Sequence, residues 1–283
     1  MSGTWVLWAA AANLAALALR FGVPTLLTAL GLHPPYRGPR YQLLGKRALV
    51  VATSHGSLDR PGRRGGRPTG VFASEMTAPC YAFADAGMTV DMASIQGAEI
   101  PVEPISLRWP LASGADRRFL RDGALQAKVR QSPSIEQVDF ASYDIVFLAG
   151  GWGAAYDFAQ TRALGRGLSV AWAAGAVVGG VCHGPLGLLQ ASDVDGSPLV
   201  RGRRLTAVTD RQIAQLGIRF TPMHPERDLR AAGAHFESRH AMRDMFAQHV
   251  VDDGRLVTGQ NQNAGTATAQ RMLQLAGGQE IPR

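Results

Sequence analysis

Cysteine is scarce in this sequence, which has only Cys80 and Cys182 among its 283 residues. Two cysteines cannot build a disulfide framework, and such usage is typical of a reducing compartment, where a lone thiol serves either packing or chemistry. The sequence also lacks the Walker-type and dinucleotide-binding glycine patterns, so no nucleotide cofactor is predicted. Its later histidines, from His224 to His249, do not show the spacing of metal ligands, and we expect neither a metal site nor a cofactor.

Negative charge is in short supply: the formal net charge is +7 and the isoelectric point is about 10.1. A basic protein is a candidate for nucleic-acid binding, but the basic residues are spread along the chain. The only dense run is Arg60 to Arg67, RPGRRGGR. No zinc-finger spacing, heptad repeat or aromatic-basic motif accompanies it. We interpret the run as a solvated basic loop and expect no nucleic-acid partner.

An uncharged apolar run stands apart at the N-terminus. Residues 5–19 carry no charge, Arg20 interrupts the run, and the apolar pattern continues to residue 32. The uncharged part is short for a bilayer span, and no basic region precedes it as in a signal peptide. Two interpretations remain open: residues 5–32 form a membrane anchor or interfacial helix, or a hydrophobic helix docked on the domain or on a partner subunit. Positive charges follow the run, so an anchor would leave the rest of the protein in the cytoplasm.

After this N-terminal segment and its linker (residues 1–40), residues 41–283 show the alternation of one α/β domain. Apolar runs predict strands, and helical periodicity with glycine stops predicts helices. Strands that alternate with helices imply a mainly parallel sheet covered on both faces. The predicted strands are 47–52, 88–94, 143–148, 176–181 and 204–208, followed by a hairpin over 249–259. The predicted helices are 75–87, 115–130, 156–164, 210–216, 225–233 and 264–275.

One predicted strand runs directly into a helix at Cys182, within the stretch VVGGVCHGPLGLL at 177–189. Such a corner lies at the carboxyl edge of a parallel sheet, and the small residues around it allow the sharp turn of a nucleophile elbow. The following helix would direct its amides and its dipole at the sulfur, which predicts a lowered thiol pKa. The amide of His183 would face an oxyanion formed there. The flanking glycines and the adjacent histidine favour a nucleophile over a thiol that only packs in the core.

Five stretches together resemble the ThiJ/PfpI superfamily. They occur in the same order as in that superfamily and cover most of residues 46–275. The nearest branch is the one with glyoxalase-III-like and stress-chaperone members. The resemblance implies the fold of class I glutamine amidotransferase domains: an α/β, flavodoxin-like three-layer sandwich with a mainly parallel sheet and a cysteine nucleophile elbow. The stretches are TSHG at 53–56, PTGVFASEMTAPCYAFADAGMTVDMAS at 68–94, YDIVFLAGGWGAAYD at 143–157, GGVCHGPLGLL at 179–189 and DGRLVTGQNQNAG at 253–265.

The resemblance assigns Cys182 as the nucleophile, His183 as its neighbouring catalytic histidine, and Glu75, in the pattern E-x-x-x-P, as the acid that meets the sulfur. A protonated carboxylic acid can donate a hydrogen bond to a thiolate and later transfer the same proton, which supports the pairing. Gly150 and Gly151 end the strand beside the elbow. An amide there, that of Gly151, would complete an oxyanion hole with the amide of His183.

One position departs from the pattern of the resembling branch. A carboxylate near a T-N-x-E-E stretch commonly orients the histidine there, but residues 208–212 read VTDRQ, and Gln212 stands where the acid is expected. Asp210 either takes over the orienting role or caps the helix that follows. A histidine without its orienting acid is a poorer base.

Three further residues are expected near the site or behind it. His55, in TSHG, is expected to rim the pocket, and Trp152, beside the glycine pair, to form part of its wall or to lie in the core. Cys80, on the helix of Glu75, is expected to pack rather than to react.

Two classes of function follow. The first is a cofactor-independent lyase of the glyoxalase III type, which converts 2-oxoaldehydes such as methylglyoxal to 2-hydroxy acids through the Cys182 thiolate; protein deglycation would use the same sulfur. The second is a holdase chaperone or a cysteine redox sensor, because an accessible thiolate is also readily oxidised. The expected partners are a small carbonyl substrate and a second copy of the chain in a homodimer. Residues 1–36 are expected to be dispensable for the chemistry.

Overall fold

A six-stranded sheet forms the centre of the molecule. The computed structural model describes residues 3–218 and 220–281. The strand order is β3-β2-β4-β5-β9-β8, and all neighbouring strands are parallel except β9 and β8. The predicted mainly parallel sheet is therefore confirmed. Its strands are β2 (Arg47–Ala52), β3 (Thr89–Ser94), β4 (Ile145–Leu148), β5 (Val177–Val181), β8 (Val250–Asp253) and β9 (Leu256–Gly259).

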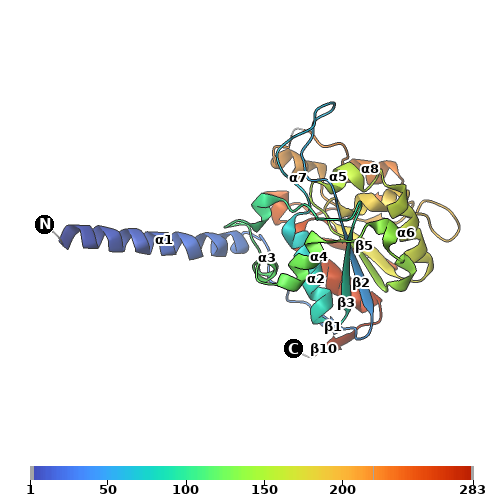
Figure 1. Ribbon diagram of the computed structural model, residues 1–283, viewed down its shortest axis with the longest axis horizontal. Coiled ribbons are helices and arrows are strands. Elements are labelled where there is room, and N and C mark those ends of the chain that lie inside the picture. The colour runs from blue at the N-terminus through green and yellow to red at the C-terminus, as the bar shows by residue number, and fades with distance from the viewer. Residues whose placement is uncertain (1–2, 219, 282–283) are drawn as a thin grey trace.

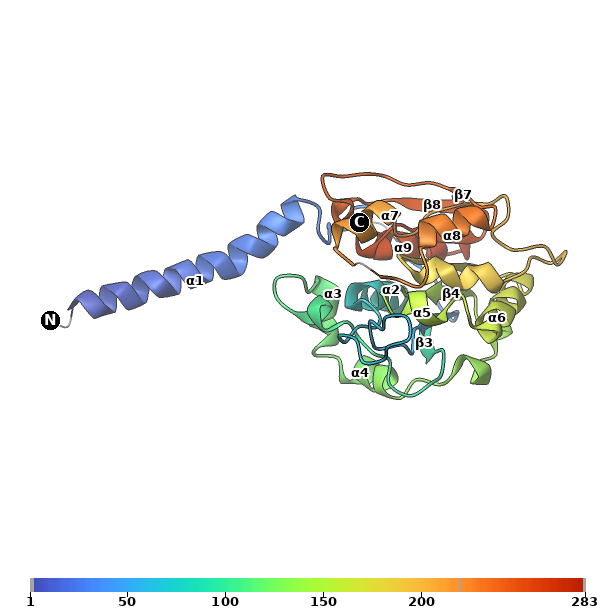
Figure 2. The ribbon, with the colours of Figure 1, turned by 90° about the horizontal axis from the view of Figure 1, so that it is seen from above.

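Helices cover both faces of this sheet, as Figures 1 and 2 show. Alternate strand residues point to opposite faces: on β2, Val50 packs in one hydrophobic cluster, whereas Leu49 and Val51 pack in the other. The predicted three-layer α/β sandwich is confirmed. The Val50 cluster includes residues of α2 (Ala73–Asp85), α3 (Gly114–Phe119), α4 (Gly123–Arg130), α7 (Asp210–Gln215) and α9 (Gly265–Leu275). The other includes residues of α5 (Ala154–Asp157), α6 (Arg162–Ala173), the 3₁₀ helix η4 (Gly184–Gln190) and α8 (Pro225–Ala231).

The predicted strand 204–208 is wrong in extent and place. β6 (Arg204–Leu205) has two residues and pairs with β7 (His235–Phe236), outside the main sheet. It stops there because the next amide, that of Thr206, donates to the Oγ1 of Thr258 at 2.8 Å instead of continuing the ladder. A further small sheet joins β1 (Arg40–Gln42) to β10 (Gln279–Ile281) near the C-terminus.

The predicted helix 156–164 is also wrong, because α5 ends at Asp157 and α6 begins at Arg162. The Asp157 carboxylate accepts hydrogen bonds from the Thr53 hydroxyl and the Ser54 amide, each at 2.8 Å. The Thr161 hydroxyl donates to the Asp157 carbonyl at 2.7 Å. These bonds hold a turn between the two helices. The remaining short 3₁₀ helices are η1 (Pro104–Leu107), η2 (Ile135–Gln137), η3 (Phe140–Ser142), η5 (Asp244–Phe246) and η6 (Gln262–Ala264).

The N-terminal helix α1 (Gly3–Ala29) projects away from the domain (Figures 1 and 2). Its 22-residue stretch Trp8–Ala29 is long and apolar enough to cross a membrane by length and composition, and none of the hydrophobic window within it is buried. The alternative that the helix docks on its own domain is therefore wrong. Most of its described side chains are exposed, and Val23, Pro24 and Leu27 are half-buried near the domain end of the helix. Nε1 of Trp109 also donates to the carbonyl of Arg20 at 3.2 Å.

Close contact between β5 and β9 gives a test of the sheet. A Cβ added at Gly179 would lie 1.7 Å from the carbonyl oxygen of Val257, which no side-chain rotation can relieve. We expect Gly179→Ala to lower the free energy of unfolding by about 2 kcal/mol or more. Gly123→Ala is the matched control, since a Cβ there meets nothing within 4 Å and lies in a helix. Urea unfolding of both variants measures the difference, and equal midpoints would contradict the packing described here.

Candidate active site

Cys182 follows the last residue of β5 in a strained backbone conformation. Its φ is 59°, in the left-handed region that a residue with a Cβ rarely adopts. Two hydrogen bonds hold it there: its amide donates to the carbonyl of Gly259 at 3.1 Å, and its carbonyl accepts from the amide of Val208 at 3.0 Å. This is the geometry of the predicted nucleophile elbow.

Glycines make room for the elbow. A Cβ at Gly184 would lie 2.2 Å from the Leu148 carbonyl oxygen, so the chain after Cys182 can pass β4 only with glycine. A Cβ at Gly150 would lie 2.3 Å from Oε2 of Glu75 and 2.8 Å from Cβ of Cys182. Gly150 thus provides the gap through which the carboxyl group and the cysteine approach each other.

A cavity of about 250 Å³ opens over the sulfur. Glu75, Gly151, Trp152 and Cys182 lie in its wall, which is one of the two positions considered for Trp152. Most of the other lining residues are apolar, and they come from segments far apart in the sequence. They are Leu32, His33, Leu58, Arg67, Phe72, Glu103, Ile105, Leu111, Val208, Gln212, Leu216, Ile218, Met245 and Gln262.

Glu75 is held as a neutral acid. Its side chain is buried, and this burial raises the pKa of the carboxyl group to about 8, although the neighbouring Cys182 thiol and the Gly151 amide act in the opposite direction. At neutral pH the carboxyl group therefore carries a proton. It faces the sulfur, and it can donate that proton to a group bound above Cys182.

The predicted lowering of the Cys182 pKa is wrong. Burial, the Glu75 charge and the Glu75 hydrogen bond raise the pKa of the thiol well above its ordinary value. The segment after the elbow is a seven-residue 3₁₀ helix, a weaker source of dipole than the α-helix expected from the sequence. The amides of Gly151 and His183 do bond to the sulfur and lower its pKa in part. Both amides are thus directed where an oxyanion would form.

His183 is a buried, neutral base. Its Nδ1 lies 3.4 Å from Sγ of Cys182. Burial, with a smaller contribution from the charge of His224, lowers the pKa of the imidazole to about 3. The ring packs against Trp152, with ring centroids 4.8 Å apart. A neutral imidazole can accept the thiol proton during attack on a carbonyl.

Neither role considered for Asp210 is found. Among the described residues the Nε2 atom of His183 has no hydrogen-bond partner. The Asp210 carboxylate instead bonds to Nδ1 of His224 at 2.9 Å. The helix cap is Thr209, whose hydroxyl accepts from the amide of Gln212 at 3.0 Å, while Asp210 is already the first residue of α7. Packing against Trp152, rather than an acid, therefore holds the histidine ring.

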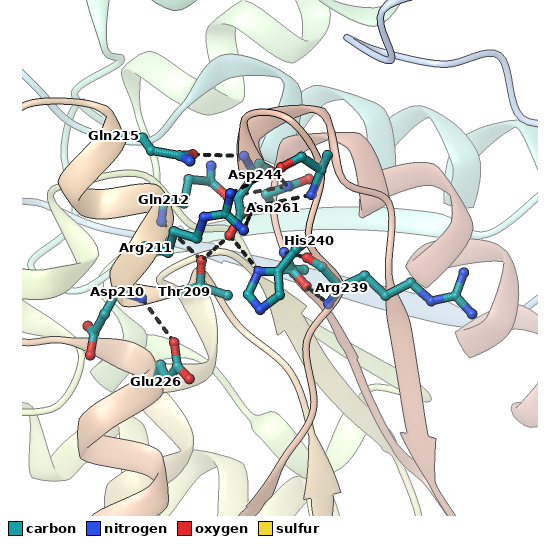
Figure 3. A network of polar contacts seen from close by, with 12 residues as sticks. Thr209, Asp210, Arg211, Gln212, Gln215, Glu226, Arg239, His240, Asp244 and Asn261 are labelled. Carbon is teal, nitrogen blue, oxygen red and sulfur yellow. Dashed lines mark hydrogen bonds and ion pairs between the residues drawn. The ribbon is translucent and has the colours of Figure 1, made fainter.

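Gln212 belongs to a polar network beside the cavity, shown in Figure 3. Its Oε1 accepts from Nδ2 of Asn261 at 3.3 Å, and Asn261 also donates to the Asp244 carbonyl at 2.9 Å. The buried Asp244 carboxylate accepts from the Thr209 hydroxyl at 3.1 Å and, if its tautomer allows, from His240 at 3.0 Å. The network holds the start of α7 in place, but it does not provide an acid for His183.

Two sequence candidates lie away from the cavity. The expectation for His55 is wrong: its ring stacks on Tyr156 at 4.1 Å and its Nε2 lies 2.6 Å from the Ser57 carbonyl oxygen, outside the lining residues. Cys80 is buried, and burial raises the pKa of its thiol to about 12, as suits a packing residue.

Several lining residues could not be assigned to the cavity from the sequence. Leu32 and His33 lie in the linker assigned to the N-terminal segment, and Arg67 lies in the run interpreted as a solvated loop. The density of arginines was the available signal, but no local pattern shows that the loop returns to the cavity.

Comparison with known proteins finds relatives of similar sequence and similar fold. Residues 69–275 match the DJ-1/PfpI family. The chain is 27% identical over 218 residues to glyoxalase 3 of Candida albicans, covering 74% of this chain and 90% of the relative. It is 28% identical over 236 residues to a glutathione-independent glyoxalase of Saccharomyces cerevisiae, covering 81% and 97%. Among solved structures, the rapid encystment protein of Francisella tularensis aligns with a TM-score of 0.74 at 28% identity, covering 82% of this chain and 99% of that one.

The buried carboxyl group gives a pH test. Because the pKa of Glu75 rises from 4.5 in the unfolded chain to about 8 in the folded protein, the folded state holds one more proton between these values. Stability should therefore fall as pH rises from 6.5 to 8, with a slope of up to about 1.4 kcal/mol per pH unit. His183, with its pKa lowered from 6.5 to about 3, has the opposite effect, which is strongest between these two values and fades as pH rises above 6.5. In Glu75→Gln the slope should flatten, as measured by urea unfolding at several pH values; an unchanged slope would contradict a neutral Glu75.

Proposed function

The chain belongs to the DJ-1/PfpI family, and from that premise we propose that it is a cofactor-independent lyase of the glyoxalase III type. It converts 2-oxoaldehydes such as methylglyoxal to 2-hydroxy acids. The observation that carries the proposal is a group of three: a strained Cys182 and a protonated Glu75 in the cavity wall, and a neutral His183 buried beside the sulfur. The relatives named glyoxalase 3 and glutathione-independent glyoxalase match this chain over nearly their whole length, which supports an enzyme of this type.

The first step forms a hemithioacetal. The Cys182 sulfur bonds to the aldehyde carbon while its proton moves to Nδ1 of His183, which lies 3.4 Å away. The electron pair of the carbonyl bond moves to oxygen, where the amides of Gly151 and His183 stabilise the charge. Glu75 then gives its proton to this oxygen and becomes a carboxylate. A thiol with a raised pKa suits this order, because deprotonation accompanies attack instead of preceding it.

The second step moves a proton between adjacent carbons. The Glu75 carboxylate removes the proton from the carbon that carries sulfur, His183 protonates the neighbouring oxygen, and an enediol results. Glu75 returns its proton to the second carbon, and the hydroxyl on the carbon that carries sulfur gives its own proton to the Glu75 carboxylate, which leaves a thioester of the 2-hydroxy acid. Water hydrolyses this thioester to the acid and the free thiol. One carbon is oxidised and its neighbour reduced, so the reaction needs no external oxidant or reductant.

Glu75→Gln tests the proton transfer. The variant keeps the shape and a hydrogen-bond donor but has no transferable proton, so we expect turnover of methylglyoxal to lactate to fall by roughly a hundredfold or more. Iodoacetamide labelling of Cys182 should remain measurable, which shows that the nucleophile is present.

Two further variants complete the experiment. Glu136→Gln, at an exposed glutamate remote from the cavity, should keep wild-type turnover. Cys182→Ala should abolish turnover, whereas a holdase would keep suppressing client aggregation. Lactate formation within a few-fold of wild type in Glu75→Gln would refute the role assigned to that residue.

We further propose that α1 tethers the enzyme to a membrane with the catalytic domain on the cytoplasmic side. Its 27 residues extend roughly 40 Å, more than the ~30 Å hydrocarbon core of a bilayer. Trp5 and Trp8 lie near one end of the helix, as aromatic residues do at membrane interfaces. The exposed apolar surface of the helix supports a lipid environment.

Because the linker after α1 contributes to the cavity wall, a truncation that tests the tether must remove the helix and keep the linker. The His33 amide donates to Oδ1 of Asn263 at 2.8 Å, and its ring bonds to the Leu111 carbonyl at 2.9 Å, so Leu32 and His33 are fixed in the cavity wall. Removal of residues 1–28 should release the protein from membranes and leave turnover intact. Removal of residues 1–40 should also lower turnover, contrary to the expectation that residues 1–36 are dispensable. Fractionation and lactate assays measure both effects, and a soluble full-length protein would exclude the tether.

A further inference from the structure

A second hollow joins the cysteine cavity. It has a volume of about 750 Å³ and shares Leu58, Arg67, Leu216 and Ile218 with the wall of the catalytic cavity. The two hollows are therefore neighbours that share part of one wall. Its remaining lining residues are Asp59, Arg60, Arg63, Arg64, Gly65, Gly66, Gly217 and Phe220.

One wall of the hollow is an arginine loop, residues 58–67, that is folded around a carboxylate. Oδ1 of Asp59 accepts from the Ser57 hydroxyl at 2.8 Å and from the amides of Gly65 and Gly66 at 2.9 and 3.1 Å. Arg60 and Arg63 pair through a backbone bridge. The loop thus has a defined shape, although all of its arginine side chains are exposed.

The charge of this hollow is strongly positive. Four guanidinium groups line it, and within the described part of the chain none of them is in an ion pair. The one acid among the described lining residues is Asp59, whose carboxylate accepts hydrogen bonds within the loop, so positive charge is in excess. In the neighbouring cavity Glu103 accepts from the Thr69 hydroxyl at 2.6 Å, and Glu75 carries a proton. The opposite wall is apolar, with Leu216 and Phe220 partly exposed. Such a surface fits a small organic anion.

The geometry points to an anion subsite that selects the substrate: the enzyme takes 2-oxoaldehydes that carry a phosphate or carboxylate group, with Arg67 and the neighbouring arginines binding the anion while the aldehyde lies over Cys182. Arginine suits this role because its planar fork binds phosphate and carboxylate oxygens in pairs. The inference rests on the proposed function, since it names the substrate class of the same site. Arg67 is the central residue because it lines both hollows.

Paired substrates test the subsite on the full-length protein. kcat/KM is measured for phosphorylated hydroxymethylglyoxal, for a 2-oxoaldehyde with a terminal carboxylate, and for neutral propylglyoxal. We expect wild type to prefer at least one anionic substrate by tenfold or more at low salt, and the preference to shrink as salt is added. In Arg67→Gln the preference should fall about tenfold, and Arg63→Gln/Arg64→Gln should reduce it further. Arg121→Gln removes the same charge from another surface and should leave all three values unchanged.

The outcomes separate this inference from the proposed function. Equal kcat/KM for neutral and anionic substrates, or a preference untouched by Arg67→Gln, overturns the subsite while the lyase stands. If no 2-oxoaldehyde is consumed, the proposed function fails, and calorimetry with dihydroxyacetone phosphate decides the subsite by itself. Binding of dihydroxyacetone phosphate that weakens with added salt and in Arg67→Gln supports the anion subsite. Absence of binding overturns the subsite.

Discussion

The close approach of a buried carboxyl group to a cysteine is the constraint on which the rest of this site depends. Glu75 comes from the start of α2 and Cys182 from the end of β5, and the two meet only because Gly150, at the end of the intervening β4, has no side chain. The strained backbone of Cys182 is held by β9 on one side and by the loop before α7 on the other. A parallel sheet brings all these strand ends to one edge, which is why residues scattered over the sequence form one cavity.

Burial decides the chemistry of the three reacting groups. It raises the pKa of the acid, raises that of the thiol and lowers that of the histidine, so each group is neutral at rest. A neutral site contains a proton donor and a proton acceptor at the same pH, which a reaction that moves protons between carbons requires. The absence of an orienting acid for His183, among the described residues, is consistent with this arrangement, because such an acid would favour the charged imidazole.

The cavity also lies between two segments that precede the matched family region, residues 69–275. The linker after α1 contributes Leu32 and His33, and the arginine loop contributes Arg67. The family region thus contains the reacting groups, whereas the proposed tether and the arginines of the proposed anion subsite come from residues before it. A scaffold that keeps its chemistry on strand ends can change location and selectivity through such peripheral segments.

The sequence by itself determined what depends on local order. The apolar runs of β2, β4 and β5, the helix of Glu75 and the glycine-flanked corner at Cys182 could all be predicted, because period, glycine content and neighbouring residues specify them. The role of Glu75 needed the family resemblance as well. Only the tertiary structure decided the direction of the Cys182 pKa, the pairing of Asp210 with His224, and the return of Arg67 to the cavity. Each of these depends on burial or on contact between distant segments, and neither quantity is written in the order of residues along one stretch of chain.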